Sequence, residues 1–72
     1  MKKKPFNRVR YASYRQISDK ACVVHCYDGS KSVLPLSQII HEYDAVLVPN
    51  WLINKKWEEG VKLQHNSTLV WK

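Results

Sequence analysis

Cationic and aromatic side chains recur close to the start of the chain, in residues 8–15. In an extended strand every second residue lies on the same face, so Arg8, Arg10 and Tyr14 are predicted to share one face. Arginine neutralises phosphate groups and releases their counterions, and an aromatic ring between cations stacks on a base. This pattern predicts a surface for a single-stranded nucleic acid, either DNA or RNA.

The residues in front of this strand add positive charge and one more aromatic ring. The predicted nucleic-acid-binding residues are Lys2, Lys3, Lys4, Phe6, Arg8, Arg10, Tyr14 and Arg15. A second interpretation is that the lysines form a solvated tail and that the arginines protect an edge strand against aggregation. Both interpretations remain open for these residues, and the distribution of charge along the chain favours binding.

The positive charge of the chain is concentrated in its first quarter. The 72 residues include 12 Lys and Arg against 6 Asp and Glu, which gives a formal net charge of +6. Residues 1–20 contain seven of the basic residues and one acidic residue, Asp19, whereas the charges of residues 21–72 cancel. Such asymmetry predicts an anionic partner, and nucleic acid is a common one for a basic domain.

Cys22, His25 and Cys26 have the residue types of a metal site. Residues four apart on a strand have Cα atoms roughly 13 Å apart, whereas a disulfide needs about 7 Å or less. A structural zinc site usually has two close ligand pairs, and this chain has one pair, which a strand splits between two faces. We therefore predict buried free thiols, with no metal and no cofactor.

The sequence predicts a binding protein and not an enzyme. A nucleophile needs an adjacent base and a group that orients the base. The chain contains Ser37 and two cysteines as nucleophiles and three histidines as bases, without a triad-like spacing or a glycine-rich phosphate loop.

Short β-type segments separated by turn signals account for most of the chain. Strands are predicted at residues 8–17, 21–27, 31–34 and 45–48, with a last strand or hairpin within residues 61–71. Asp28-Gly29 predicts a hairpin with a type I′ turn. Residues 36–40 predict one helical or 3₁₀ turn that places Ile39 and Ile40 in the core. A helix is expected near residues 50–59, ended by Gly60.

The predicted fold class is mostly β (α+β): a small antiparallel sheet or an SH3/OB-like barrel with one short helix near residues 50–59. Residues 1–7 are expected to form a flexible basic arm, and residues 8–72 a single small domain. Trp51 and Trp57 are predicted to pack in the core, whereas Trp71 is expected to be exposed or to form a dimer contact. A core of this size makes a homodimer plausible as well.

No apolar run approaches the roughly 18 residues of a membrane span. The segment after the three lysines is not apolar, so no secretory signal is predicted and the expected location is intracellular.

Two proline-containing stretches carry a resemblance to a known group of proteins. Residues 34–39 read Leu-Pro-Leu-Ser-Gln-Ile, and residues 48–52 read Val-Pro-Asn-Trp-Leu. In order and spacing, residues 22–56 resemble small uncharacterised phage and prophage proteins, whereas residues 1–15 and 61–72 depart from that pattern. The resemblance implies a phage or mobile-element origin and a location in the cytoplasm of a bacterial host, and it carries over no functional residue.

The resemblance also implies an alternative function. Small phage proteins often block a host protein, so the chain is alternatively expected to inhibit a host polymerase, nuclease or defence complex. Its aromatic residues suit such a role, because Trp and Tyr are enriched where protein interfaces gain most of their binding energy.

Overall fold

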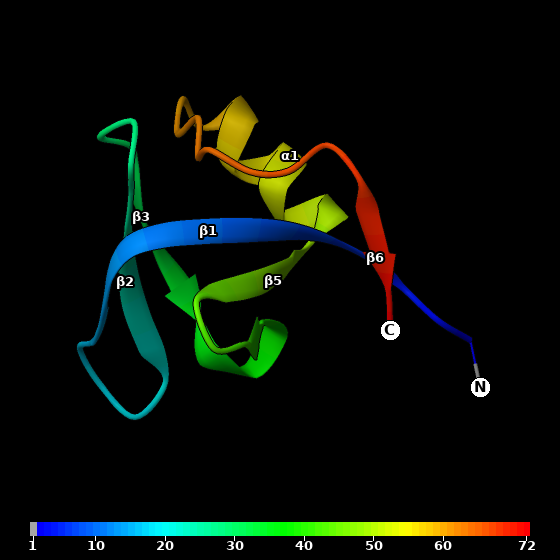
Figure 1. The fold of residues 1–72 in the computed structure, drawn as a ribbon, viewed down its shortest axis with the longest axis horizontal. Helices are drawn as coiled ribbons and strands as arrows, with labels where there is room; N and C mark the ends of the chain where they lie inside the picture. The colour runs from blue at the N-terminus through cyan, green and yellow to red at the C-terminus, as the bar shows by residue number, and fades with distance from the viewer. Residues whose placement is uncertain (1) are drawn as a thin grey trace.

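β1 (Pro5–Gln16) is the longest strand of the computed structural model, which describes residues 2–72 (Figure 1). The N-terminal half of β1 pairs with β5 (Ala45–Pro49) along one edge and with β6 (Leu69–Trp71) along the other. The C-terminal half of β1 pairs with β2 (Ala21–Cys26). All these pairings are antiparallel. Through them β1 joins three strands that are distant from one another in the sequence.

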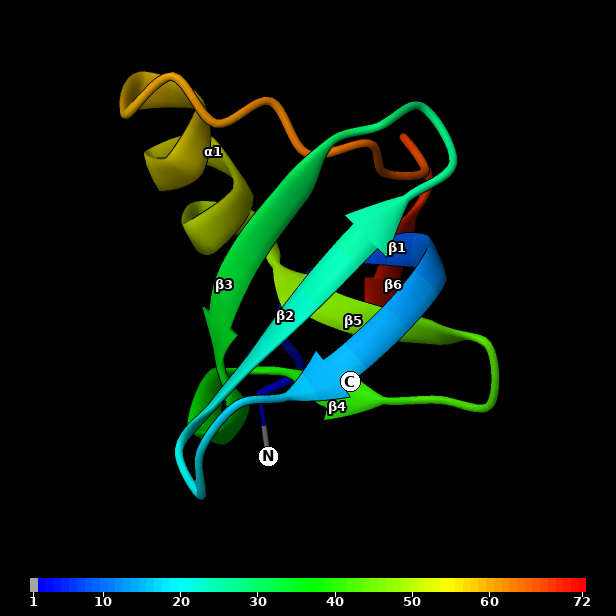
Figure 2. The ribbon, with the colours of Figure 1, turned by 90° about the vertical axis from the view of Figure 1, so that its left-hand side faces the viewer.

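The remaining strands extend the sheet at its two ends. They are β3 (Lys31–Pro35), which pairs with β2, and β4 (Ile40–His41), which pairs with β5. Figure 2 shows β3, β2 and the C-terminal half of β1 side by side, with β5 behind them, so the sheet is strongly curved. The predicted mostly β fold with an antiparallel sheet and one short helix is confirmed.

One extra residue in β1 changes which side chains face the core. Tyr11 lies opposite Cys26 and Ser13 lies opposite His25, which leaves Ala12 without an opposite residue. This is a β-bulge, and an insertion of one residue reverses the alternation of side chains beyond it.

The bulge contradicts part of the predicted strand pattern. Tyr14 lies opposite Val24, a fully buried core residue, so Tyr14 is on the core face and not on the face of Arg8 and Arg10. An uninterrupted alternation would place Ile17 on the face of the buried Val9, but Ile17 is exposed.

The turn between β2 and β3 is a hairpin, as predicted, but its type differs from the prediction. Gly29 has a φ of +89°, whereas Asp28 does not have a positive φ. The Gly29 N–H donates to the Cys26 carbonyl (3.1 Å), and the Cys26 N–H donates to the Ser30 carbonyl (2.8 Å). The loop is therefore a type I turn followed by a left-handed glycine, because a type I′ turn needs two residues with positive φ.

The predicted 3₁₀ turn after β3 is confirmed as η1 (Leu36–Gln38). Only one of the two isoleucines expected in the core lies there. Ile39 packs against the core, whereas Ile40 begins β4 and is exposed.

The helix α1 (Asn50–Glu58) starts directly after Pro49, and Gly60, with a φ of +88°, follows its end as predicted. Leu52 and Ile53 are the helix residues that enter the core. The prediction that Trp51 and Trp57 pack there is wrong, because their exposed fractions are 54% and 48%. A helix of nine residues with a narrow buried stripe leaves its large indoles outside. No helix within residues 2–72 is long and apolar enough to cross a membrane.

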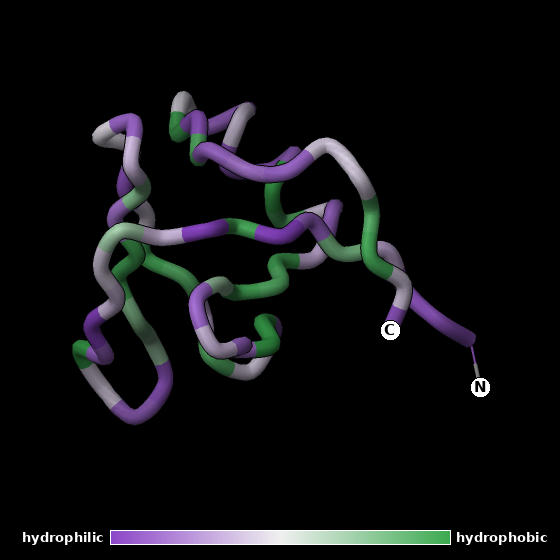
Figure 3. Tube along the Cα trace, in the orientation of Figure 1, coloured by the Kyte–Doolittle hydropathy of each residue, from purple (hydrophilic) through white to green (hydrophobic). Residues whose placement is uncertain are grey.

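The core lies between the curved sheet, α1 and the segment that follows the helix. It consists of Val9, Cys22, Val24, Cys26, Leu34, Val46, Val48, Leu52, Ile53 and Leu63. Figure 3 shows the contrast between β5, which is hydrophobic along most of its length, and β1, which alternates. Every residue of β5 is buried, which explains why this strand has no polar side chains.

Residues 5–7 are more ordered than predicted, whereas Met1 of the expected arm lies outside the described residues. Pro5, Phe6 and Asn7 belong to β1, so the expected flexible arm of residues 1–7 is wrong for these three. The Lys4 N–H donates to the Lys72 carbonyl (2.8 Å), and the Lys72 N–H donates to the Lys4 carbonyl (3.1 Å). The pairing of β1 with the C-terminal segment therefore begins at Lys4.

Candidate nucleic-acid interface

Four of the predicted site residues share one face of β1 and its N-terminal extension. Lys4, Phe6, Arg8 and Arg10 alternate along the extended chain in front of the bulge, so their side chains point to the same side, away from Val9 and the core. We call these four residues the outer face of β1. The sequence pattern correctly predicted that Arg8 and Arg10 lie together.

The two arginines of this face are already paired with carboxylates of the same protein. The Arg8 Nε donates to Glu42 Oε1 at 2.9 Å, and the Arg10 Nη2 donates to Asp44 Oδ2 at 3.1 Å. Both carboxylates come from the short connection between β4 and β5, which the pairing of β5 with β1 brings beside the arginines. The positive charge of Arg8 and Arg10 is thus balanced within the fold.

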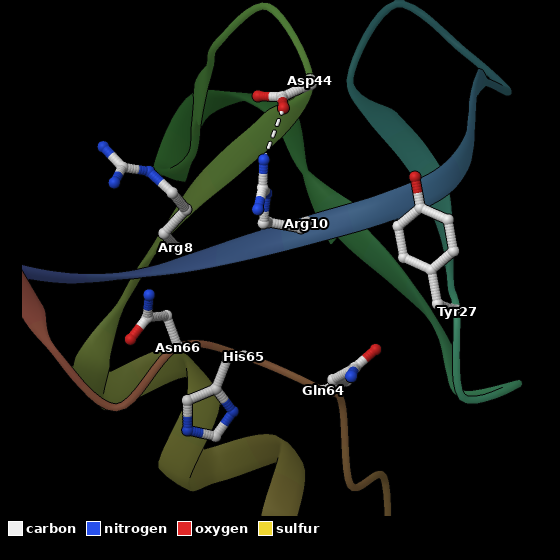
Figure 4. Close-up of a pocket in the computed structure, with 7 residues that line it drawn as sticks. All are labelled: Arg8, Arg10, Tyr27, Asp44, Gln64, His65 and Asn66. Atoms are coloured by element: carbon white, nitrogen blue, oxygen red, sulfur yellow. Dashed lines mark hydrogen bonds and ion pairs between the residues drawn. The ribbon is translucent and has the colours of Figure 1, made fainter.

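Figure 4 shows the groove that borders this pair of arginines. Arg10 points to Asp44, while residues 64–66 lie across the groove and Tyr27 stands at its far end. The groove has a volume of about 460 Å³. Because Arg10 already faces a carboxylate, this groove offers little attraction to a phosphate backbone.

Phe6 and Tyr14 do not form the predicted stacking surface. Phe6 is only 8% exposed, so neighbouring residues cover most of its ring although it lies outside the core cluster around Val9. Tyr14 was moved by the bulge, and its ring stacks on the imidazole of His41, with ring centres 4.2 Å apart. The Tyr11 hydroxyl lies 2.7 Å from His41 Nε2, so these three rings form one cluster that packs against the core.

The electrostatics of this cluster fit a structural role. Burial is the main cause that raises the pKa of Tyr11 and of Tyr14, and the charge of Asp44 adds to the effect at Tyr11. Both phenols are therefore neutral at physiological pH and add no charge to a binding surface.

Arg15 lies beyond the bulge, opposite Val23, and it is exposed. The C-terminal end of β1, which carries Arg15, is on the opposite side of the molecule from the two chain ends in Figure 1. The predicted site residues are therefore divided between two ends of the fold and an ion-paired middle.

At the end that contains both termini, two lysines form a cross-strand pair. The backbones of Lys4 and Lys72 exchange two hydrogen bonds, so the two residues lie directly opposite each other. We call them the terminal lysine pair. Neither of them forms an ion pair with a carboxylate of residues 2–72, and Lys2 and Lys3 next to them are exposed. Like charges that face each other across a ladder destabilise it, which makes this pair a favourable place for an anion.

Two exposed indoles border the terminal lysine pair. Trp71 precedes Lys72 and lies opposite Pro5, so its side chain is on the other face of the ladder from Lys4 and Lys72, and it is 55% exposed. Trp51 lines a second pocket, of about 470 Å³, to which Lys4 also contributes. Lys72 and both indoles were not predicted as site residues, because they come close to the first lysines only when the strands pair. The pairing of β6 with β1 brings Lys72 and Trp71 there, and the pairing of β5 with β1 brings Trp51 there. The alternation at the end of the sequence indicated a strand but not its partner.

The cysteines are free and buried, as predicted. Cys22 and Cys26 both belong to the core, and burial is the main cause that raises the pKa of each thiol. His25, between them, is exposed on the opposite face of β2. No group of three or more potential metal ligands comes together in the part of the chain that the structure describes.

Comparison of the chain with protein-family models, with curated proteins and with solved structures finds no match. The resemblance to small phage proteins therefore stays a prediction.

Proposed function

We propose that this protein binds single-stranded nucleic acid through the end of the sheet that carries the terminal lysine pair. The observation that supports this proposal is the direct opposition of Lys4 and Lys72, neither of which forms an ion pair with an acidic side chain of residues 2–72. A phosphate placed between the two ammonium groups relieves their repulsion, and Lys2 and Lys3 contribute to the attraction.

The exposed indole of Trp51, which lines a pocket together with Lys4, favours a single strand over a duplex. A base that is not paired exposes its flat face, and stacking on an aromatic ring does not depend on its identity. The location that fits this role is the cytoplasm of a bacterial host, where nucleic acids are abundant partners for a small basic protein.

The test is the salt dependence of binding to fluorescently labelled single-stranded DNA and RNA. Each lost phosphate contact is expected to reduce the slope of log K against log salt by about 0.7 for a single strand. Lys4→Ala with Lys72→Ala should therefore lower the slope by the equivalent of up to two contacts. The matched control is Lys20→Ala with Lys31→Ala, which removes the same charge from other parts of the fold.

Two results would argue against this proposal. If the protein binds no single strand even at low salt, the proposed function is wrong. If the control variant lowers the slope as much as the lysine-pair variant, binding depends on net charge and not on this end of the sheet.

A second candidate is the inhibition of a host protein. It is favoured by Tyr27 and Tyr43, two tyrosines that are largely or completely exposed although the core is small. A host protein that is retained at high salt by the wild type, but not by the double variant Tyr27→Ala with Tyr43→Ala, would support this function. Loss of the same partner with the lysine-pair variant alone would instead point to a nucleic-acid bridge.

A further inference from the structure

The second pocket lies beside the terminal lysine pair, where η1, the end of β5 and the first turn of α1 meet β1. The two proline-containing stretches of the sequence both contribute to it. Gln38 comes from the first stretch, and Pro49 and Trp51 come from the second. The spacing of these stretches therefore builds a pocket and does more than end strands.

The pocket combines apolar surface, an indole, an amide and a cation. Phe6, Pro49 and Ile40 supply apolar surface, and Trp51 supplies an indole that is 54% exposed. The exposed Gln38 side chain carries an amide with two donors and one acceptor, and Lys4 supplies a positive charge. Proteins hold an unstacked base with this combination: an aromatic ring for its face, an amide for its edge and a cation for its phosphate.

The position of Trp51 is fixed by its neighbour in the chain. The Asn50 Nδ2 donates to the Oδ1 of the buried Asn7 at 2.8 Å, and the Asn50 Oδ1 accepts from Asn54 Nδ2 at 3.2 Å. These bonds hold the first turn of α1 on β1. The indole is thus presented from a rigid element, which lowers the entropy cost of binding.

We propose that this pocket receives one unstacked base of the bound strand. Trp51 stacks on the base, Gln38 forms hydrogen bonds with its edge, and Lys4 contacts the adjoining phosphate. This inference rests on the proposed function and adds to it a preference among bases, because an amide distinguishes donors from acceptors.

The experiment uses synthetic single strands that carry a base at one position and are abasic at every other position. For the wild-type protein, adding the single base to a fully abasic strand should raise the affinity about 5- to 150-fold, which corresponds to the stacking of one base. For Trp51→Ala the added base should change the affinity less than about twofold. The salt slope should be the same for both proteins, because no phosphate contact is removed.

The matched control is Trp57→Ala. Trp57 lies on the same helix with a similar exposed fraction, but Lys62 Nζ covers its ring at 5.2 Å and it does not line the pocket. Trp57→Ala should keep the full effect of the added base. Gln38→Ala should keep binding but reduce the differences in affinity among strands that carry different single bases.

The outcomes separate this inference from the proposed function. If the wild type binds the abasic strand but gains nothing from a base, or if Trp51→Ala gains as much as the wild type, the base pocket is refuted while strand binding stands. If the wild type binds neither the abasic strand nor an ordinary single strand at low salt, the proposed function fails as well. A free mononucleotide that binds as tightly as the strand would show a nucleotide site instead, and this would also overturn the inference.

Discussion

The buried side chain of Asn7 connects three parts of the fold, and its removal should destabilise the protein strongly. Asn7 is 3% exposed. Its Nδ2 donates to the Asn66 carbonyl at 3.2 Å, and its Oδ1 accepts from Asn50 Nδ2 at 2.8 Å. β1, the first turn of α1 and the C-terminal segment are thus held together by one side chain.

The expected cost of Asn7→Ala follows from these two bonds. A typical hydrogen bond contributes about 0.5–1.5 kcal/mol, and a buried group that loses its partner costs about 1–3 kcal/mol. We expect the free energy of unfolding to fall by about 2–4 kcal/mol. A chain of 72 residues has a total stability of roughly 4–11 kcal/mol, so this single change should remove a large part of it.

Urea unfolding followed by tryptophan fluorescence measures this cost. The control is Asn54→Ala, which removes one exposed hydrogen bond to Asn50 and should cost less than about 0.5 kcal/mol. Asn7→Asp should cost at least as much as Asn7→Ala at neutral pH, because its carboxylate is buried and one of its oxygens faces the Asn66 carbonyl, to which it has no proton to donate. A cost below about 1 kcal/mol for Asn7→Ala, with an unchanged dependence on urea, would refute the role of this network.

Three further predictions concern the hairpin, the ion pairs and the thiols. Gly29→Ala should lower the free energy of unfolding by about 1–2 kcal/mol, because a φ of +89° is unfavourable for any residue with a Cβ, even though no atom lies within 4 Å of the added Cβ. An unchanged melting temperature would contradict this prediction. In double-mutant cycles, the pair Arg8 and Glu42 should show a coupling energy of about 1 kcal/mol. The more exposed pair Arg10 and Asp44 should show a coupling energy of less than about 0.5 kcal/mol. Equal coupling energies would show that exposure does not determine the strength of these ion pairs. Burial raises the pKa of Cys22 and Cys26 above 9.0, so the stability that they contribute is present below that pH and is lost as the pH rises above it. Urea midpoints on either side of this pH should show the loss, and iodoacetamide should modify the thiols of the native protein far more slowly than those of the unfolded protein.

The parts of the fold that depend on local signals were predictable from the sequence. Gly29 and Gly60 both adopt the positive φ that ends an element, and Pro35 ends β3. The alternation of β2 placed Cys22 and Cys26 in the core correctly. These signals act between residues that are close in the chain, and a sequence therefore reveals them.

The bulge at Ala12 was not predictable, because nothing in the residue types marks it. One unpaired residue moved Tyr14 to the core face and exposed Ile17. A pattern with a period of two fails at such a point for every later residue of the strand. The predicted stacking partner of the arginines was lost for this reason.

The ion pairs of Arg8 and Arg10 show why charge along the sequence differs from charge on the surface. Glu42 and Asp44 belong to the part of the chain whose charges cancel, and they come within hydrogen-bond distance of the arginines only because β5 pairs with β1. Folding leaves the net charge of +6 unchanged. Because Arg8 and Arg10 are ion-paired, the unpaired positive charge lies mainly towards the ends of the fold.

The energetic difference between the two groups of cations supports the proposed location of the binding site at the terminal lysine pair. A phosphate at Arg8 or Arg10 must compete with a carboxylate that is already 2.9 or 3.1 Å away, so it gains only the difference between two similar interactions. A phosphate at Lys4 and Lys72 instead removes a repulsion that the free protein bears. Binding energy is gained where the unbound state is unfavourable. The same rule that makes a like-charge pair a defect in an isolated sheet therefore supports the proposal that a polyanion binds there.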